Sequence, residues 1–139
     1  FVPHLTIIGD INIELNKLKE VVDNAFINTQ KFSIKKIKIN QSELFFKTVF
    51  IEFELNEELK NAFLSLSQKT DKRNLENFKP HISLMYKQMP ENEKIKIVEN
   101  LDLKKEYLIG SVYINAPKNS DKDFLNVEGW QTVYKKDLI

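Results

Sequence analysis

The chain has 139 residues, 42% of them hydrophobic, and a formal net charge of +1 at pH 7. This length lets one domain bury a core unaided, and the absence of cysteine excludes disulfides and thiolate metal sites. No segment approaches the roughly 20 apolar residues of a membrane span, and so small a net charge argues against nonspecific binding to polyanions. We therefore expect one monomeric domain over residues 1–139, without membrane association and in a reducing, cytoplasmic setting.

Four elements are predicted in the first part of the chain from the spacing of its apolar side chains. Runs in which β-branched and aromatic residues alternate with polar ones indicate strands, whereas apolar residues at intervals of three and four predict a helix. Turn-forming residues separate the runs. The elements are, in order, a strand at 4–8, a helix at about 12–28, and two strands at 32–39 and 46–55 joined in a hairpin around 40–43.

The rest of the chain is predicted to contain two further helices and three further strands. Acidic residues in the first turn favour a helix start at residue 57, and Pro90 is suited to opening the second helix. The resulting order of elements indicates an α+β fold with mostly antiparallel strands. The predicted helices are 57–69 and 91–101, the strands are 81–86, 107–116 and 130–134, and the polar loops are 70–79 and 117–126, the second expected to be mobile.

The two histidines of the chain, His4 and His81, lie in the nearly identical pentads PHLTI and PHISL. In a strand, residues i and i+2 point to the same face, so His4 lies beside Thr6 and His81 beside Ser83. An imidazole with a pKa near 6.5 can serve as base or acid at neutral pH, and a hydroxyl can donate a hydrogen bond to a phosphoryl oxygen. The pentads therefore contain the minimum set of groups for cleaving a phosphodiester without a metal.

The paired His-x-Thr and His-x-Ser motifs, 77 positions apart, resemble the two signatures of the two-histidine (2H) phosphoesterase superfamily. PHLTIIG at 3–9, FKPHISLMYK at 78–87 and GWQTVYKKDLI at 129–139 are most similar to its cyclic phosphodiesterase branch, and the match covers nearly the whole chain. The resemblance implies two α+β lobes related by a pseudo-twofold axis, each bringing one motif to a central cleft floored by antiparallel strands. It also implies hydrolysis of a cyclic phosphate, of the 2',3'-cyclic nucleotide or ADP-ribose cyclic phosphate type, on a small nucleotide or an RNA end.

The resemblance also implies roles for five residues. His4 and His81 would be the acid and base, in an order that stays open, and Thr6 and Ser83 would bind the phosphate. Tyr86 stands where the branch commonly has an aromatic residue, and it would cover the nucleotide or contact the phosphate. Strict alternation would put Tyr86 on the face opposite His81, so this role requires the strand to bend or end there.

Three departures or ambiguities accompany this interpretation. The family's usual N-terminal strand and helix have no counterpart, and the chain begins at Phe1 without a methionine, which leaves open that it is truncated at its N-terminus. Lys87 replaces the glycine that often follows the aromatic residue of the branch. The remaining prominent aromatic residues are interpreted as core rather than as platforms for a base, namely Trp130, Phe45, Phe46, Phe50 and Phe53.

Alternative functions remain open from the residues alone. Cleavage of 2'-5' linked or cyclic oligonucleotides would need the same four motif residues and a longer groove. A chain that keeps the site without turnover would be an RNA-end binding module. A metal site is disfavoured because two histidines without a carboxylate motif underfill a metal's coordination shell, so we expect neither a metal nor a cofactor.

Overall fold

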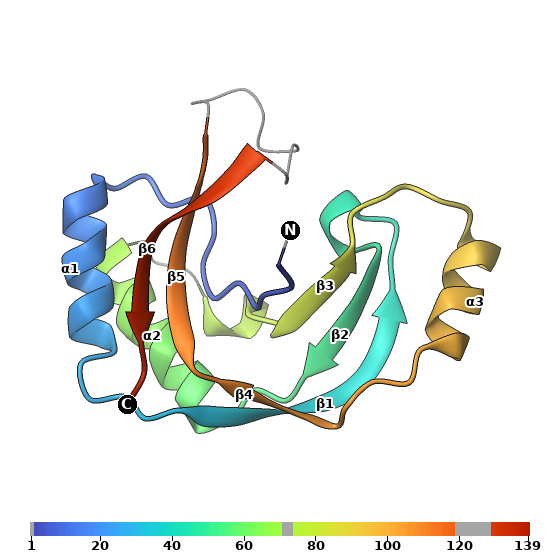
Figure 1. Ribbon diagram of the computed structural model, residues 1–139, viewed down its shortest axis with the longest axis horizontal. Helices are drawn as coiled ribbons and strands as arrows, with labels where there is room; N and C mark the ends of the chain where they lie inside the picture. The colour runs from blue at the N-terminus through green and yellow to red at the C-terminus, as the bar shows by residue number, and fades with distance from the viewer. Residues whose placement is uncertain (1, 71–73, 119–128) are drawn as a thin grey trace.

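The computed structural model describes residues 2–70, 74–118 and 129–139 (Figure 1). It is an α+β fold with antiparallel strands, which confirms the predicted fold class, whereas the two-lobed symmetry and the central cleft stay predictions. From residue 119 onward, the predicted loop at 117–126 lies outside the described residues. The elements are, in order, α1 (Leu15–Ala25), β1 (Phe32–Gln41), the 3-10 turn η1 (Phe45–Lys47), β2 (Val49–Phe53), α2 (Glu57–Thr70), the 3-10 turn η2 (Leu75–Asn77), β3 (His81–Met85), α3 (Glu91–Asn100), β4 (Glu106–Ile109), β5 (Ser111–Pro117) and β6 (Trp130–Asp137).

The strands form a curled antiparallel surface. Four of them pair in the order β3-β2-β1-β4, and β5 pairs with β6. Gly110 separates β4 from β5, and its carbonyl accepts a hydrogen bond from the backbone N–H of Leu138 (2.9 Å). Ile139 makes backbone hydrogen bonds with Thr29 and Lys31, just before β1. The end of β6 is thereby tied to the start of β1, and the surface curls from β3 round to β6 (Figure 1).

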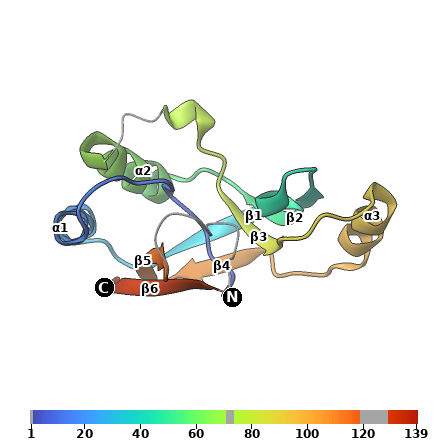
Figure 2. The ribbon, with the colours of Figure 1, turned by 90° about the horizontal axis from the view of Figure 1, so that it is seen from above.

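The hydrophobic core lies between this surface and the helices α1 and α2. Figure 2 shows α1 and α2 near one end of the molecule, while α3 stands at the opposite end and contacts β1. On α1, Asp23 accepts hydrogen bonds from Tyr134 and Lys136 of β6, which ties this helix to the sheet. The buried core residues are Val22, Phe26, Phe32, Ile34, Ile51, Phe53, Leu59, Ala62, Phe63, Leu66, Phe78, Ile82 and Leu138.

Side-chain caps set the starts of two helices. The carboxylate of Glu14 accepts hydrogen bonds from the backbone N–H groups of Asn16 and Lys17, so α1 begins at Leu15, later than predicted. The amide oxygen of Asn56 accepts from Leu59 N–H at the start of α2. No helix in the described part of the chain is both long and apolar enough to cross a membrane.

Two of the predicted strands have different bounds in the structure. The predicted strand at 107–116 is divided at Gly110 into β4 and β5, which pair with different strands. The predicted strand at 46–55 begins only at Val49, because Phe45–Lys47 form a 3-10 turn. The hydroxyl of Thr48 donates to the carbonyls of Leu44 and Phe45 and thereby closes that turn.

The predicted strand at 4–8 is wrong. The only ladder contact of this segment is an isolated antiparallel bridge between Leu5 and Ile82. Leu5, Ile7 and Ile8 all pack against the core, and strict alternation cannot place two consecutive residues on one face. The apolar run therefore reflects contact with the core and not a regular strand.

Trp130 is also placed differently from its prediction as a core residue. It is 40% exposed and pairs with Pro117 at the outer end of the two-stranded β5–β6 ribbon. This end of the ribbon extends away from α1 and α2, so a large apolar side chain there is not covered by the core (Figure 1).

Candidate active site

The second motif lies on β3, which pairs with β2. His81 is opposite Glu52, and Ser83 is opposite Phe50. Between them, Ile82 is buried in the core. Because side chains alternate along a strand, His81 and Ser83 lie on the face that points away from the core.

The first motif reaches the same face through the bridge between Leu5 and Ile82. In an antiparallel arrangement centred on this pair, His4 comes opposite Ser83, and Thr6 comes opposite His81. Leu5 packs against the core, as Ile82 does, whereas Thr6 is exposed. The N-terminal segment runs beside β3 (Figure 1). The bridge thus brings together two motifs that lie 77 positions apart in the sequence.

The two imidazoles are oriented in the same way. Nδ1 of His4 donates to the carbonyl of Val2 (2.8 Å), and Nδ1 of His81 donates to the carbonyl of Lys79 (2.8 Å). A carbonyl oxygen can only accept, so Nδ1 carries a proton in both rings. Nε2 of each neutral ring therefore holds the lone pair, and it is the atom that can accept a proton during a reaction.

Burial lowers the pKa of the His81 imidazole from its usual value of 6.5. The hydrogen bond to the Lys79 carbonyl opposes this shift, as does the carboxylate of Glu52, while the positive charges of Lys47 and His4 reinforce it. His81 is therefore mostly neutral at pH 7. That the charge of His4 acts on His81 also indicates that the two rings share one site.

The two motif hydroxyls have different surroundings. Thr6 is exposed, whereas Ser83 is only 5% exposed. The Ser83 hydroxyl donates to the backbone carbonyl of Phe46 in η1 (2.6 Å), and it is also hydrogen-bonded to the side chain of Tyr86. Burial raises the pKa of the Tyr86 phenol above its ordinary value of 10.0, so the phenol keeps its proton at neutral pH.

A bulge in β3 brings Tyr86 to the side of Ser83. Ser83 pairs with Phe50 and Met85 pairs with Val49, so Leu84 is an extra residue that interrupts the alternation. The strand then ends at Met85. A role for Tyr86 at the site required the strand to bend or end before this residue. The structure meets this requirement.

An aromatic group surrounds Tyr86 and includes two residues that the sequence assigned to the core. The Phe45 ring is stacked on Tyr86 (6.4 Å between centroids), and the Phe46 ring meets it edge-on (5.8 Å). Phe46 is 38% exposed, so its assignment to the core is wrong. Phe50 and Phe53 are buried as predicted, at 3% and 2% exposure.

Lys47 is a candidate functional residue that sequence reasoning missed. Its ammonium nitrogen lies 4.3 Å from the ring centroid of Phe50, and the Phe50 ring meets the His81 ring at 5.9 Å. A single lysine in a lysine-rich chain gives no sequence signal. Only the hairpin turn η1, which brings Lys47 to the site face, distinguishes it.

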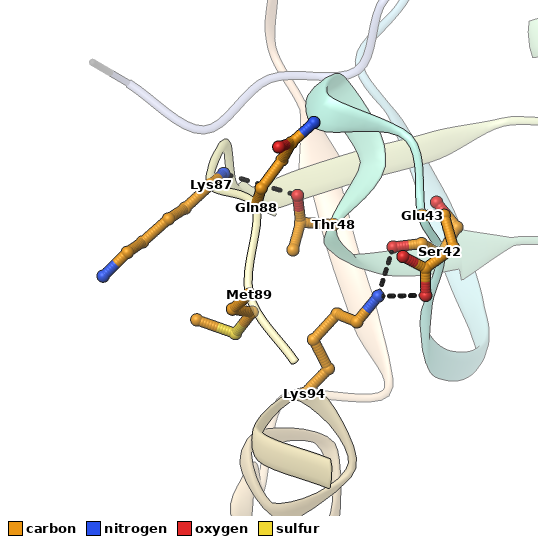
Figure 3. Close-up of a pocket in the computed structure, with 7 residues that line it drawn as sticks. All are labelled: Ser42, Glu43, Thr48, Lys87, Gln88, Met89 and Lys94. Atoms are coloured by element: carbon orange, nitrogen blue, oxygen red, sulfur yellow. Dashed lines mark hydrogen bonds and ion pairs between the residues drawn. The ribbon is translucent and has the colours of Figure 1, made fainter. Parts of the chain in front are cut away.

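A pocket of about 440 Å³ lies beside η1, and hydrogen bonds between its lining residues hold the segments on either side of the turn (Figure 3). From α3, Lys94 reaches across it and donates to the carbonyl of Ser42 (2.9 Å) and to the carboxylate of Glu43 (2.7 Å). The hydroxyl of Thr48 accepts from the backbone N–H of Lys87 (3.3 Å). None of the motif residues lines this pocket, so we do not assign it as the reaction centre.

Sequence comparisons place the whole chain in one family. Residues 1–136 match the family described as cyclic phosphodiesterase-like protein. A cyclic phosphodiesterase from Arabidopsis thaliana is 23% identical over 136 residues, which cover 96% of this chain and 75% of the plant protein. The resemblance inferred from the two pentads is therefore confirmed, and the chain belongs to the cyclic phosphodiesterase-like family of 2H phosphoesterases.

Proposed function

We propose that this chain hydrolyses a cyclic phosphate, of the 2',3'-cyclic nucleotide or ADP-ribose cyclic phosphate type, with His4 and His81 as its acid and base and without a metal. The substrate is a small nucleotide or an RNA end. Membership of the cyclic phosphodiesterase-like family supports the class of reaction. The observation that carries the residue assignment is the bridge between Leu5 and Ile82, because it sets the two motifs against each other in antiparallel register.

The reaction opens the cyclic phosphate by in-line attack of water. Nε2 of one neutral imidazole takes a proton from the water as the new P–O bond forms. The other histidine, as an imidazolium, gives its Nε2 proton to the ribose oxygen as the old P–O bond breaks. The product is a phosphomonoester, and exchange of one proton with solvent restores both rings.

The surroundings of the two rings favour one division of labour. His81 has a lowered pKa and a free lone pair on Nε2, so we assign it as the base that activates water. His4 is then the acid. Thr6 and Ser83 are assigned as hydroxyls that donate hydrogen bonds to the phosphoryl oxygens, and Tyr86 is hydrogen-bonded to Ser83.

Steady-state hydrolysis of nucleoside 2',3'-cyclic phosphates in the presence of EDTA tests this proposal. We expect turnover to survive the chelator, and His4→Ala and His81→Ala each to lower kcat on the order of 100- to 10,000-fold. Lys96→Met, on the exposed side of α3, is the control and should retain full activity. Chelator-sensitive turnover would exclude the metal-free mechanism, and full activity in both histidine variants would exclude the assigned residues. Tight binding of a nucleoside 2'-phosphate without any turnover would indicate an RNA-end binding module instead.

A further inference from the structure

We propose that Lys47 is a substrate-binding residue of this site, whose ammonium group binds the phosphoryl group. This inference rests on the proposed function and deepens it. The ligand class is a phosphate ester, bound more tightly as the dianionic monoester product than as the singly charged cyclic substrate.

Lys47 lies on the same face as the motif residues. Phe50 pairs with Ser83 in the sheet, its ring meets His81, and its other contact is the ammonium group of Lys47 at 4.3 Å from the ring centroid. A cation over the face of an aromatic ring is attracted by the ring's quadrupole. Because Phe50 is buried, this attraction holds the ammonium group against the site and not in open solvent.

The hydroxyl of Ser83 fixes the residue that immediately precedes Lys47. It donates to the carbonyl of Phe46 at 2.6 Å, in a position that is 5% exposed.

Two further hydroxyl groups hold the same turn. Ser42 donates to the carbonyl of Lys47 itself, and Thr48 donates to the carbonyl of Phe45 (3.1 Å). Lys94, which is 1% exposed, in turn holds the carbonyl of Ser42. The backbone of η1 is therefore fixed from three sides, which lets it present the Lys47 side chain in a defined place.

The reaction creates a need for more positive charge than the single imidazolium of the two motifs supplies. A cyclic phosphate carries one negative charge, whereas a phosphomonoester approaches two at neutral pH. The motif side chains are hydroxyls and imidazoles, so a nearby ammonium group would stabilise the charge that develops. On the same face, the carboxylate of Glu52 is engaged by Lys38 (3.7 Å) and Asn40 (3.4 Å), which reduces its repulsion of the phosphate.

Isothermal titration calorimetry with adenosine 2'-monophosphate, adenosine 3'-monophosphate and uncharged adenosine tests the role of Lys47. Lys47→Met and Lys47→Gln should weaken binding of at least one monophosphate by about 10- to 100-fold and leave adenosine binding unchanged. Lys47→Arg should recover most of the affinity because it keeps the charge. Lys96→Met, an exposed lysine on α3, is the charge-matched control and should bind as the wild type does. Monophosphate affinity within two-fold of the wild type in both neutral Lys47 variants would overturn the assignment of Lys47.

Failure of this inference is distinguishable from failure of the proposed function. A wild-type enzyme that hydrolyses cyclic phosphates, with Lys47 variants that bind and turn over normally, would refute Lys47 and leave the function in place. A wild-type chain without turnover, whose monophosphate affinity still depends on Lys47, would refute the function and support the anion site.

Discussion

Each histidine is held by a carbonyl two residues upstream, with a proline in between. Pro3 separates Val2 from His4, and Pro80 separates Lys79 from the second histidine. Proline fixes its own φ, so it restricts the path between the acceptor carbonyl and the ring that donates to it. The Pro-His pair that recurs in both motifs thus orients both imidazoles through Nδ1.

His81 should titrate below its ordinary value. Burial disfavours the charged ring, so the pKa of His81 in the folded protein lies below 6.5, and protonation occurs only at lower pH. Because the chain has two histidines, ring C–H resonances followed by NMR against pH give two curves, and His4→Gln assigns the remaining one. Lys47→Met should move the His81 midpoint upward, since a positive charge that opposes protonation is removed. A His81 midpoint at or above 6.5 in the wild-type protein would contradict the predicted lowering of its pKa.

At the scale of elements, the strands and helices with regular patterns were predictable, and the irregular positions were not. β3 and α2 fall within a residue or two of their predicted bounds, because each has an unbroken apolar pattern. Bulges at Ile37 in β1 and Leu84 in β3 depend on how neighbouring strands pair, which no local pattern encodes. From the sequence, Tyr86 could therefore be placed at the site only on the condition that the strand bends or ends before it.

Helix α3 was predicted, but the way it attaches to the sheet was not. Its one buried residue is Lys94, which a pattern of apolar spacing treats as exposed. The side chain crosses to the turn after β1 and satisfies two oxygens there. A buried polar contact of this kind depends on tertiary structure, and its partners Ser42 and Glu43 are 52 and 51 positions away.

Replacing Lys94 should loosen this attachment. Lys94→Met keeps the volume of the side chain but leaves the Ser42 carbonyl without its donor, at a cost of about 1–3 kcal/mol in the free energy of unfolding. The Glu43 carboxylate is largely exposed and can return to water, so it adds little. Urea unfolding of Lys94→Met and of the exposed control Lys96→Met measures the difference. Equal stability of the two variants would show that Lys94 does not anchor α3.

At the scale of the whole molecule, the site depends on two contacts between segments distant in sequence. One is the bridge between the two pentads, and the other is the strand pairing that brings Lys47 to them. The pentads could be found from the sequence because each is contiguous, and their pairing across 77 positions was expected from the family resemblance alone. Lys47, by contrast, reaches the site only through the pairing of β1, β2 and β3. The curl of the surface follows from backbone hydrogen bonds of Leu138 and Ile139 at one end of the β5–β6 ribbon, and these bonds have no local sequence signature.

Substitutions of Leu5 and Leu138 distinguish two contacts. Leu5 forms the bridge to Ile82 that brings the motifs together, and Leu138 makes the hydrogen bond to Gly110 that closes the fold. Leu138 is 4% exposed in the core, so Leu138→Ala should lower the free energy of unfolding by about 2–5 kcal/mol. Leu5 is only partly buried, and Leu5→Ala should cost less stability. It also loosens the segment that sets His4 opposite Ser83, and a shift of about 1 Å at a reaction centre lowers the rate on the order of 100-fold.

The two variants should therefore rank in opposite orders, with the higher kcat in Leu138→Ala and the higher stability in Leu5→Ala. Measured below the melting temperature of both, Leu138→Ala should keep a kcat near that of the wild type, whereas Leu5→Ala should lose most of it while remaining the more stable. Urea unfolding and steady-state hydrolysis on the same preparations decide this. If Leu5→Ala keeps full kcat, the bridge to Ile82 does not position His4, and the antiparallel arrangement of the two motifs would not be the basis of the site.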